Sequence, residues 1–170
     1  SGLRDAYMAR SPVIAISGGP AVASRYRHAY QEVEDFEQFN GVTKANMNVD
    51  SPARLPDLLR QAFRTATSGM PGPVHLRFQG RASDVPLGDC DAESLVEKQY
   101  TRVPPFRPEP EGERVRDAAA ELAKAAKPII LAGGGVTASQ AQREVVELAE
   151  KLQIPVATSL NGKGTILDTH

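Results

Sequence analysis

Three tracts of this chain combine residue types that could bind a ligand or move a proton. The first, GGGVTA, begins at Gly133 and fits G-x-G-x-x-A between a predicted strand and a predicted helix. Free backbone N–H groups in such a loop can hold a phosphate. The next predicted strand, residues 154–159, contains no Asp or Glu to bind a ribose, so the nicotinamide-binding pattern is incomplete. A tight turn that packs a helix closely on a strand explains the glycines equally well.

The second tract is acidic. Four carboxylates lie within six residues: Glu32, Glu34, Asp35 and Glu37. One of them could serve as a general acid or base, although a solvated surface explains them more simply. The third group is the histidines, His28, His75 and His170, which are far apart and lack the spacing of metal ligands. His75 alternates within a predicted strand and is interpreted as a structural residue.

The elements that must position these residues alternate between strands and helices. A short apolar run, PVIAIS from Pro12, precedes Gly18-Gly19-Pro20, which is typical of a parallel strand that ends in a loop at its carboxyl edge. A short helix is expected before Gly41. Ser51 is expected to cap an amphipathic helix with the apolar positions Leu55, Leu58, Leu59, Ala62, Phe63 and Ala66. The helix leads through SGMPGPV into the strand VHLRF.

A second set of elements follows an irregular segment. Residues 81–112 show no sustained period and contain VPPFRPEPEGE, which predicts an ordered linker and a domain boundary. Periodicity returns in a helix with Val115, Ala119, Leu122 and Ala126 on one face, followed by the strand PIILA. After the glycine loop come a helix with the stripe Ala141, Val145, Leu148 and Leu152 and the strand IPVATS. This order predicts a parallel strand–helix–strand unit.

Composition excludes several classes of function. The 170 residues carry 20 Lys and Arg against 21 Asp and Glu, so the net charge of −1 favours neither nucleic acid nor an anionic membrane as a partner. A single cysteine cannot form an internal disulfide. No apolar run reaches membrane-spanning length and no signal peptide is visible, so a cytoplasmic location is expected. The chain begins with Ser1-Gly2 instead of Met, which suggests a piece of a larger protein.

The order of the motifs along the chain resembles thiamine-diphosphate enzymes of the acetolactate synthase type. The motifs are PVIAISG, AYQEVEDF, VTK, ATSGMPGPVHLRF, KPIILAGGGV and IPVATSLNGKG. The resemblance covers nearly all 170 residues and implies a three-layer αβα fold with parallel sheets, in parts of two domains. Residues 1–80 would be the C-terminal half of the pyrimidine-binding domain, 81–112 a linker, and 113–170 the N-terminal part of a Rossmann-like central domain. In this family the SGMPGPV turn is chiefly architectural.

The resemblance also assigns candidate site residues. The family's Phe-Gln-Glu tract, which lines the substrate side of the cofactor, matches Tyr30-Gln31-Glu32, so Gln31 and Tyr30 are the catalytic candidates. An amide such as that of Gln31 can donate to a developing oxyanion. The family's FAD contacts match Gly133, Gly134, Gly135 and Thr158, which leaves open whether FAD, ADP or no nucleotide binds there. Gly18-Gly19 stands where acetolactate synthases commonly have Gly-Gln, so other carboligases and decarboxylases of the superfamily stay open.

The expected activity is carboligation or decarboxylation of a 2-oxo acid by a larger transferase or lyase of which this chain is one part. In the family, the glutamate that activates thiamine diphosphate lies upstream of the segment matched here, and the motif that holds the diphosphate and Mg²⁺ lies downstream. No metal ligand is therefore assigned, and the chain alone is expected to be inactive. The rest of the polypeptide and a homodimer or homotetramer are the expected partners. Two alternatives are a noncatalytic nucleotide-binding or assembly module and a nicotinamide-binding domain.

Overall fold

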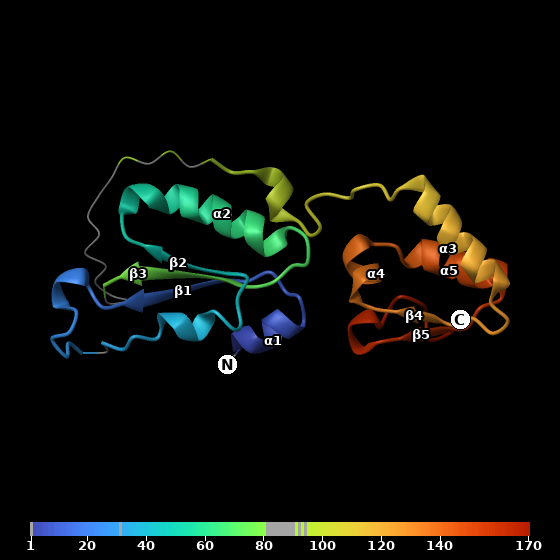
Figure 1. Ribbon diagram of the computed structural model, residues 1–170, viewed down its shortest axis with the longest axis horizontal. Helices are drawn as coiled ribbons and strands as arrows, with labels where there is room; N and C mark the ends of the chain where they lie inside the picture. Colours follow the sequence, from blue (N-terminus) through green and yellow to red (C-terminus); the bar gives the residue numbers. More distant parts are fainter. Residues whose placement is uncertain (1, 31, 81–90, 92, 94) are drawn as a thin grey trace. The chain divides into compact units, whose positions relative to one another are not determined.

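The computed structural model describes residues 2–30, 32–80, 91, 93 and 95–170. It divides into two compact units (Figure 1). Unit 1 ends at Pro105 and unit 2 begins at Phe106. Unit 1 contains α1 (Gly2–Met8), β1 (Ile14–Gly19), β2 (Ala45–Val49), α2 (Leu55–Thr67) and β3 (Val74–Gln79). Unit 2 contains α3 (Gly112–Lys124), β4 (Ile130–Ala132), α4 (Gly134–Ser139), α5 (Gln142–Leu152) and β5 (Val156–Thr158). Each unit is described by itself.

The sheet of unit 1 has the strand order β1-β3-β2, and both pairings are parallel. Residue 75 of β3 is paired with Ala15 of β1 and Asn46 of β2. Figure 1 shows α2 on one face of this sheet and the segment that contains the 3-10 helix Phe36–Phe39 on the other. In unit 2, β4 and β5 are also parallel. The predicted α/β class with parallel sheets is confirmed.

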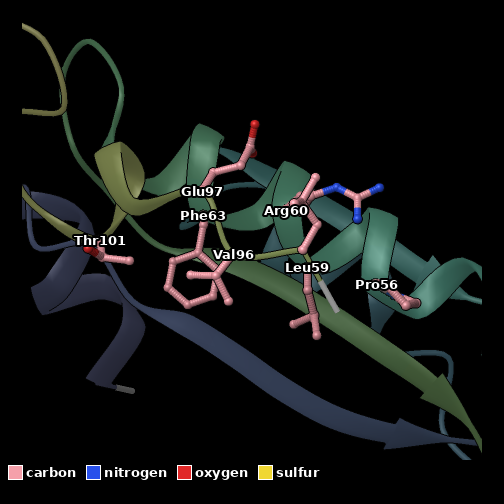
Figure 2. Close-up of a pocket in the computed structure, with 8 residues that line it drawn as sticks. Pro56, Leu59, Arg60, Phe63, Val96, Glu97 and Thr101 are labelled. Atoms are coloured by element: carbon pink, nitrogen blue, oxygen red, sulfur yellow. The ribbon is translucent and has the colours of Figure 1, made fainter. Parts of the chain in front are cut away.

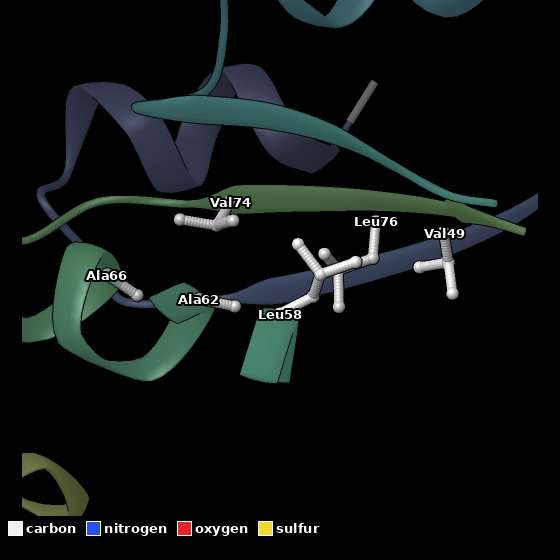
Figure 3. Close-up of a cluster of buried hydrophobic side chains, with 6 residues drawn as sticks. All are labelled: Val49, Leu58, Ala62, Ala66, Val74 and Leu76. Carbon is white, nitrogen blue, oxygen red and sulfur yellow. The ribbon is translucent and has the colours of Figure 1, made fainter. Parts of the chain in front are cut away.

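The hydrophobic core of unit 1 lies between the sheet and α2. Its buried members come from three elements and are shown in Figure 3: Val49, Leu58, Ala62, Ala66, Val74 and Leu76. The helical members are four residues apart and the β3 members two apart, which are the spacings that place side chains on one face of a helix and of a strand. The amphipathic stripe predicted for α2 is therefore the side that packs on the sheet.

Two details of unit 1 differ from the expectations. Gly18 and Gly19 belong to β1 and not to a loop, because Gly19 is paired with Gln79 and its carbonyl oxygen accepts the Gly80 N–H at 2.6 Å. Ser51 makes no side-chain cap bond, because the first turn is a 3-10 helix, Pro52–Arg54, closed by the backbone bond from Arg54 N–H to Ser51 O at 3.1 Å. The α-helix itself begins at Leu55.

The irregular segment after β3 is partly built into unit 1. Its 3-10 helix Lys98–Thr101 lies against α2, where the Arg64 guanidinium donates to both carboxylate oxygens of Glu97, with Nε at 2.7 Å from Oε2. The same guanidinium lies 5.8 Å from the centre of the Tyr100 ring. Residues 95–105 therefore pack with the first unit, and the boundary between the units falls at Pro105.

Unit 2 contains the predicted strand–helix–strand order with one change. The helix after the glycines is broken into α4 and α5 by Gln140, which has the left-handed φ of 54°. The helix expected before β4 forms as α3, but its apolar stripe is not a core in this chain. Of the four residues predicted to share that face, only Leu122 is partly covered, and Val115 is 49% exposed.

Candidate functional site

The face of the unit 1 sheet opposite α2 is polar. The residues that point to it alternate along the three strands: Ala15, Ser17 and Gly19 in β1, Asn46 and Asn48 in β2, and His75, Arg77 and Gln79 in β3. All three β3 members are buried, at 0%, 1% and 4% exposure. Buried polar side chains without partners cost free energy. Hydrogen bonds satisfy His75, whereas Arg77 Nε and Nη2, Asn48 Oδ1 and Gln79 Oε1 are buried without a hydrogen-bond partner among the described residues.

His75 is the centre of one network on this face. Its Nδ1 lies 2.7 Å from Asn46 Oδ1 and its Nε2 lies 2.7 Å from Ser17 Oγ. The Asn46 amide nitrogen donates to Phe36 O and to Asn40 Oδ1, so the Asn46 oxygen is the atom left to accept from His75. The proton therefore resides on Nδ1, and Nε2 accepts from the Ser17 hydroxyl. Burial lowers the pKa of His75, which keeps the imidazole neutral.

The order serine, histidine, asparagine is also that of a nucleophilic triad. The surroundings of His75 speak against that role. The imidazole has no exposed surface and stacks on the Phe39 ring, with 3.7 Å between centroids and 13° between planes. A general base must reach the proton of a bound substrate, which a fully covered ring cannot do. The network ties β1, β3 and β2 to the segment that contains Phe36 and Phe39, and His75 is structural, as interpreted from the sequence.

Arg77 brings a buried charge to the same face. Its Nη1 lies 3.7 Å from Glu34 Oε2 and its Nη2 lies 4.0 Å from Asp35 Oδ1, and the guanidinium lies 5.7 Å from the centre of the Phe36 ring. A Cβ at Gly19 would overlap Arg77 Nε, so only glycine leaves room for this side chain. Glu34 and Asp35, two of the four carboxylates of the acidic tract, are thus counter-ions of Arg77. This pairing favours a structural role for them over acid–base catalysis.

The turn that contains the first catalytic candidates precedes this acidic tract. Tyr30 is 73% exposed. Gln31 lies outside the residues that the structure describes. The turn is closed by Glu32, whose N–H donates to Ala29 O at 2.9 Å. Glu32 Oε2 accepts the Ala29 N–H at 2.9 Å and Oε1 accepts the Tyr26 N–H. These bonds, that from Ala29 first, lower the pKa of Glu32.

The SGMPGPV turn joins α2 to β3 through Lys44. The Lys44 ammonium donates to the carbonyl oxygens of Thr65 and Ser68 at the end of α2, the latter at 2.7 Å. Its backbone N–H donates to Pro73 O at 2.7 Å, and partial burial lowers its pKa. A cation at a helix C-terminus is favourable because the last carbonyl groups lack helical partners. Together with Gly69, at φ 60°, these bonds fix the entry into β3, so the turn is architectural.

A groove lies on the outer side of α2 (Figure 2). It has a volume of about 210 Å³ and is lined by Pro56, Leu59, Arg60, Phe63, Leu95, Val96, Glu97 and Thr101. Figure 2 shows the Phe63 ring beside Val96. The one carboxylate in the lining, that of Glu97, is already bound by Arg64. The groove therefore offers apolar contact and little polar chemistry, and we do not assign catalysis to it.

In unit 2 the structure brings the nucleotide-binding candidates together. Gly133 follows β4, and Thr158, which is exposed, ends the neighbouring β5 in register with Ala132. The two following loops contact each other. A Cβ at Gly134 would lie 3.1 Å from Asn161 Cβ, and one at Gly162 would overlap Ala132 O. In contrast, a Cβ at Gly135 would meet nothing within 4 Å. Close packing thus explains Gly134 and leaves Gly135 unexplained.

Among the residues that the structure describes, no group of three or more His, Cys, Asp or Glu side chains could hold a metal ion. Within the same residues, no helix has both the length and the apolar character needed to cross a membrane.

Sequence reasoning missed the residues that organise the polar face, Ser17, Asn46 and Arg77. A signal was present, because NMNVD from Asn46 and HLRFQ from His75 each alternate polar and apolar residues with period 2. Two such strands side by side predict one wholly polar face. The pairing of β2 with β3, which puts these polar positions in register, is known only from the structure.

Comparisons with known proteins show what the chain is similar to. Residues 115–170 match the family described as thiamine pyrophosphate enzyme, central domain. The whole chain is 37% identical to a probable acetolactate synthase large subunit of Methanocaldococcus jannaschii and 33% identical to an acetolactate synthase of Arthrospira platensis. It is 34% identical, again over its whole length, to a putative thiamine pyrophosphate-containing protein, YdaP, of Bacillus subtilis.

The chain spans 28 to 29% of the length of these three relatives. The matches nevertheless run through both units, from the strand and polar face of unit 1 to the glycine loop of unit 2. The predicted resemblance to thiamine-diphosphate enzymes of the acetolactate synthase type is confirmed, because the chain is similar along its whole length to segments of such proteins.

Proposed function

We propose that this chain is part of a thiamine-diphosphate-dependent carboligase or decarboxylase that acts on 2-oxo acids. The observation that carries the proposal is the 37% identity, along the entire chain, to a probable acetolactate synthase large subunit. Residues 1–80 would form the C-terminal half of the pyrimidine-binding domain and residues 113–170 the start of the central domain. The second assignment is supported by the central-domain match to residues 115–170.

The chain would contribute the substrate side of the site. Bound thiamine diphosphate supplies the electron sink for loss of carbon dioxide from a 2-oxo acid. Tyr30 is exposed, so its ring can line the substrate, and the amide of Gln31, which follows it in the sequence, can donate to a substrate oxygen. As the resemblance implies, Mg²⁺ and the diphosphate would be held by a segment of the full-length protein that lies downstream of the part matched here.

We also propose a nucleotide site, for FAD or ADP, at Gly133, Gly134, Gly135 and Thr158. Two loops meet at the carboxyl edge of β4 and β5, which is where parallel sheets bind ligands. The open space beside Gly135 also supports a ligand, because packing within the chain does not require glycine there. Gly135→Ala in the full-length protein should leave thermal stability unchanged and weaken FAD or ADP binding at least tenfold in calorimetry. Unchanged binding of both nucleotides would contradict this site.

The activity is tested on the full-length protein with thiamine diphosphate, Mg²⁺ and pyruvate, by release of carbon dioxide. Gln31→Ala and Tyr30→Ala should each lower kcat/KM at least tenfold and leave the affinity for thiamine diphosphate within twofold. Gln38→Ala, an exposed amide in the neighbouring 3-10 helix, is the matched control and should behave as the wild type. If the wild type binds thiamine diphosphate but releases carbon dioxide from neither pyruvate nor 2-oxobutanoate, the proposal is wrong.

Assembly and location complete the proposal. We expect a homodimer or homotetramer in the cytoplasm, as the resemblance implies. Light scattering of the full-length protein after size-exclusion chromatography measures the number of subunits directly. A monomer that retains turnover would contradict the assembly and leave the chemistry untouched.

A further inference from the structure

The turn before the acidic tract contains two residues in an unfavourable backbone conformation. Tyr26 has φ 64° and His28 has φ 53°, both in the left-handed region. Side chains other than glycine are disfavoured there, so neighbouring bonds must hold such residues in place. One side chain binds the backbone on both sides of these residues, at Tyr26 and at Ala29.

That side chain is Glu32. Oε1 accepts the N–H of Tyr26, and Oε2 accepts the N–H of Ala29 at 2.9 Å. The Glu32 N–H also donates to Ala29 O at 2.9 Å, so both backbone groups of Ala29 are bound by Glu32. Through these bonds Glu32 is tied both to Tyr26, six residues before it, and to Ala29, three residues before it. The lowered pKa of Glu32 agrees with a carboxylate that is ionised when it accepts these bonds.

Tyr30 lies inside the turn that these bonds close. It follows Ala29 directly, and its side chain is 73% exposed. The two ends of the turn are fixed by a carboxylate and a backbone bond, which restricts the directions in which Tyr30 can point. A group that must meet a substrate gains from being held in place before binding.

We propose that Glu32 is a positioning residue, whose carboxylate binds the N–H groups of Tyr26 and Ala29 and thereby presents Tyr30, next to Ala29, to the 2-oxo acid. This inference rests on the proposed function for the role of Tyr30. Glu32 acts through the turn and does not itself touch the reacting atoms.

The geometry explains why a glutamate is needed. In this turn the two N–H donors bind two different oxygens, Oε1 and Oε2, and only a carboxylate has an acceptor oxygen at both positions. A glutamine would keep one acceptor and direct an NH₂ group at the other donor. The neighbouring acids cannot replace it, because Glu34 and Asp35 face Arg77. Glu37 is exposed in the 3-10 helix Phe36–Phe39 and has the same charge, so Glu37→Ala is the matched control.

The closed turn is tested without any substrate. Trypsin cleaves after Arg25 and Arg27, which flank Tyr26, and a protease needs the local backbone to open. In the full-length protein, Glu32→Ala and Glu32→Gln should be cleaved at these two bonds at least tenfold faster than the wild type and Glu37→Ala. Cleavage of both Glu32 variants at the wild-type rate would overturn the proposal, whatever the activity of the protein.

The effect on Tyr30 is tested by a double-mutant cycle in kcat/KM for pyruvate. If Glu32 acts through Tyr30, the double variant Glu32→Gln with Tyr30→Ala should be no slower than the slower single variant. Multiplicative losses, or a Glu32→Gln enzyme with wild-type kcat/KM, would refute the positioning role. A wild type without turnover would refute the proposed function and the role of Tyr30 with it, whereas the cleavage rates would still report whether Glu32 holds the turn.

Discussion

Removal of the Ser17 hydroxyl tests the network on the polar face of unit 1. In Ser17→Ala, Nε2 of His75 loses the donor that lies 2.7 Å away, and the imidazole has no exposed surface through which water could replace it. A buried polar atom left without its partner costs about 1–3 kcal/mol. His75 belongs to the central strand of the sheet, so we expect the loss to appear in the opening of β3.

The size of the effect follows from this cost. With RT near 0.59 kcal/mol, about 1–3 kcal/mol corresponds to an increase of about 5- to 150-fold in the population of the open state. Native-state hydrogen exchange with mass spectrometry on the full-length protein measures this population in peptides that contain residues 74–79. The β4 peptide, residues 130–132 in unit 2, should exchange at the wild-type rate.

Two further variants make the test specific. Ser17→Thr keeps a hydroxyl and should stay within about threefold of the wild type, because the donor is preserved. In a His75→Leu background, Ser17→Ala should add little, since the partner of the hydroxyl is already gone. The reasoning is refuted if Ser17→Ala leaves the exchange of β3 within twofold of the wild type, or if its effect is unchanged in the His75→Leu background.

Three other predictions concern pH and the glycines Gly19, Gly134 and Gly162. The pKa of His75 is lowered by burial, so as the pH falls below the ordinary histidine pKa the unfolded state takes up a proton before the folded state does. Unit 1 should therefore lose stability toward acid, by at most about 1.4 kcal/mol per pH unit from this residue. In urea unfolding, the stability of His75→Gln should depend less on pH between pH 7 and 5. Equal slopes would contradict a buried neutral imidazole. Gly19→Ala should destabilise unit 1 by about 1–3 kcal/mol because its Cβ overlaps Arg77. Hydrogen exchange of β1 measures this loss, which should be smaller in an Arg77→Ala background. Additive losses of the two substitutions would exclude the overlap as the cause. Gly162→Ala should destabilise unit 2 more than Gly134→Ala, because the first meets the backbone of Ala132 and the second a side-chain atom of Asn161, and thermal unfolding of the full-length variants compares them.

Much of the fold could be predicted because local patterns and tertiary packing agree. In α2, apolar residues recur at Leu58, Ala62 and Ala66, and the same residues form the core. At Gly18-Gly19 the local pattern and the tertiary packing disagree. Glycine favours loops on its own, but both residues belong to β1, where they pair with Phe78 and Gln79, and Gly19 leaves the space that the Arg77 side chain needs. That requirement arises between residues 58 positions apart and leaves no local signal.

The candidate site was predicted less completely, for a related reason. Tyr30, Gln31 and Glu32 were found as a tract, but the tract alone does not show that Glu32 reaches back to Tyr26 and Ala29. In unit 2 the candidates Gly133 and Thr158 were predicted from separate motifs, and the pairing of β4 with β5 brings them to one edge. Side-chain roles that depend on such pairings need the structure.

The opposite polarity of the two sheet faces has a consequence for how unit 1 folds. Successive strand residues point to opposite faces, so a slip of β3 by one residue against its neighbours would turn His75, Arg77 and Gln79 toward α2 and Val74 and Leu76 away from it. A misaligned strand would bury a guanidinium among aliphatic side chains, with no carboxylate nearby. The alternation of polar and apolar residues in β2 and β3 thus makes shifted strand registers unfavourable and favours the native one.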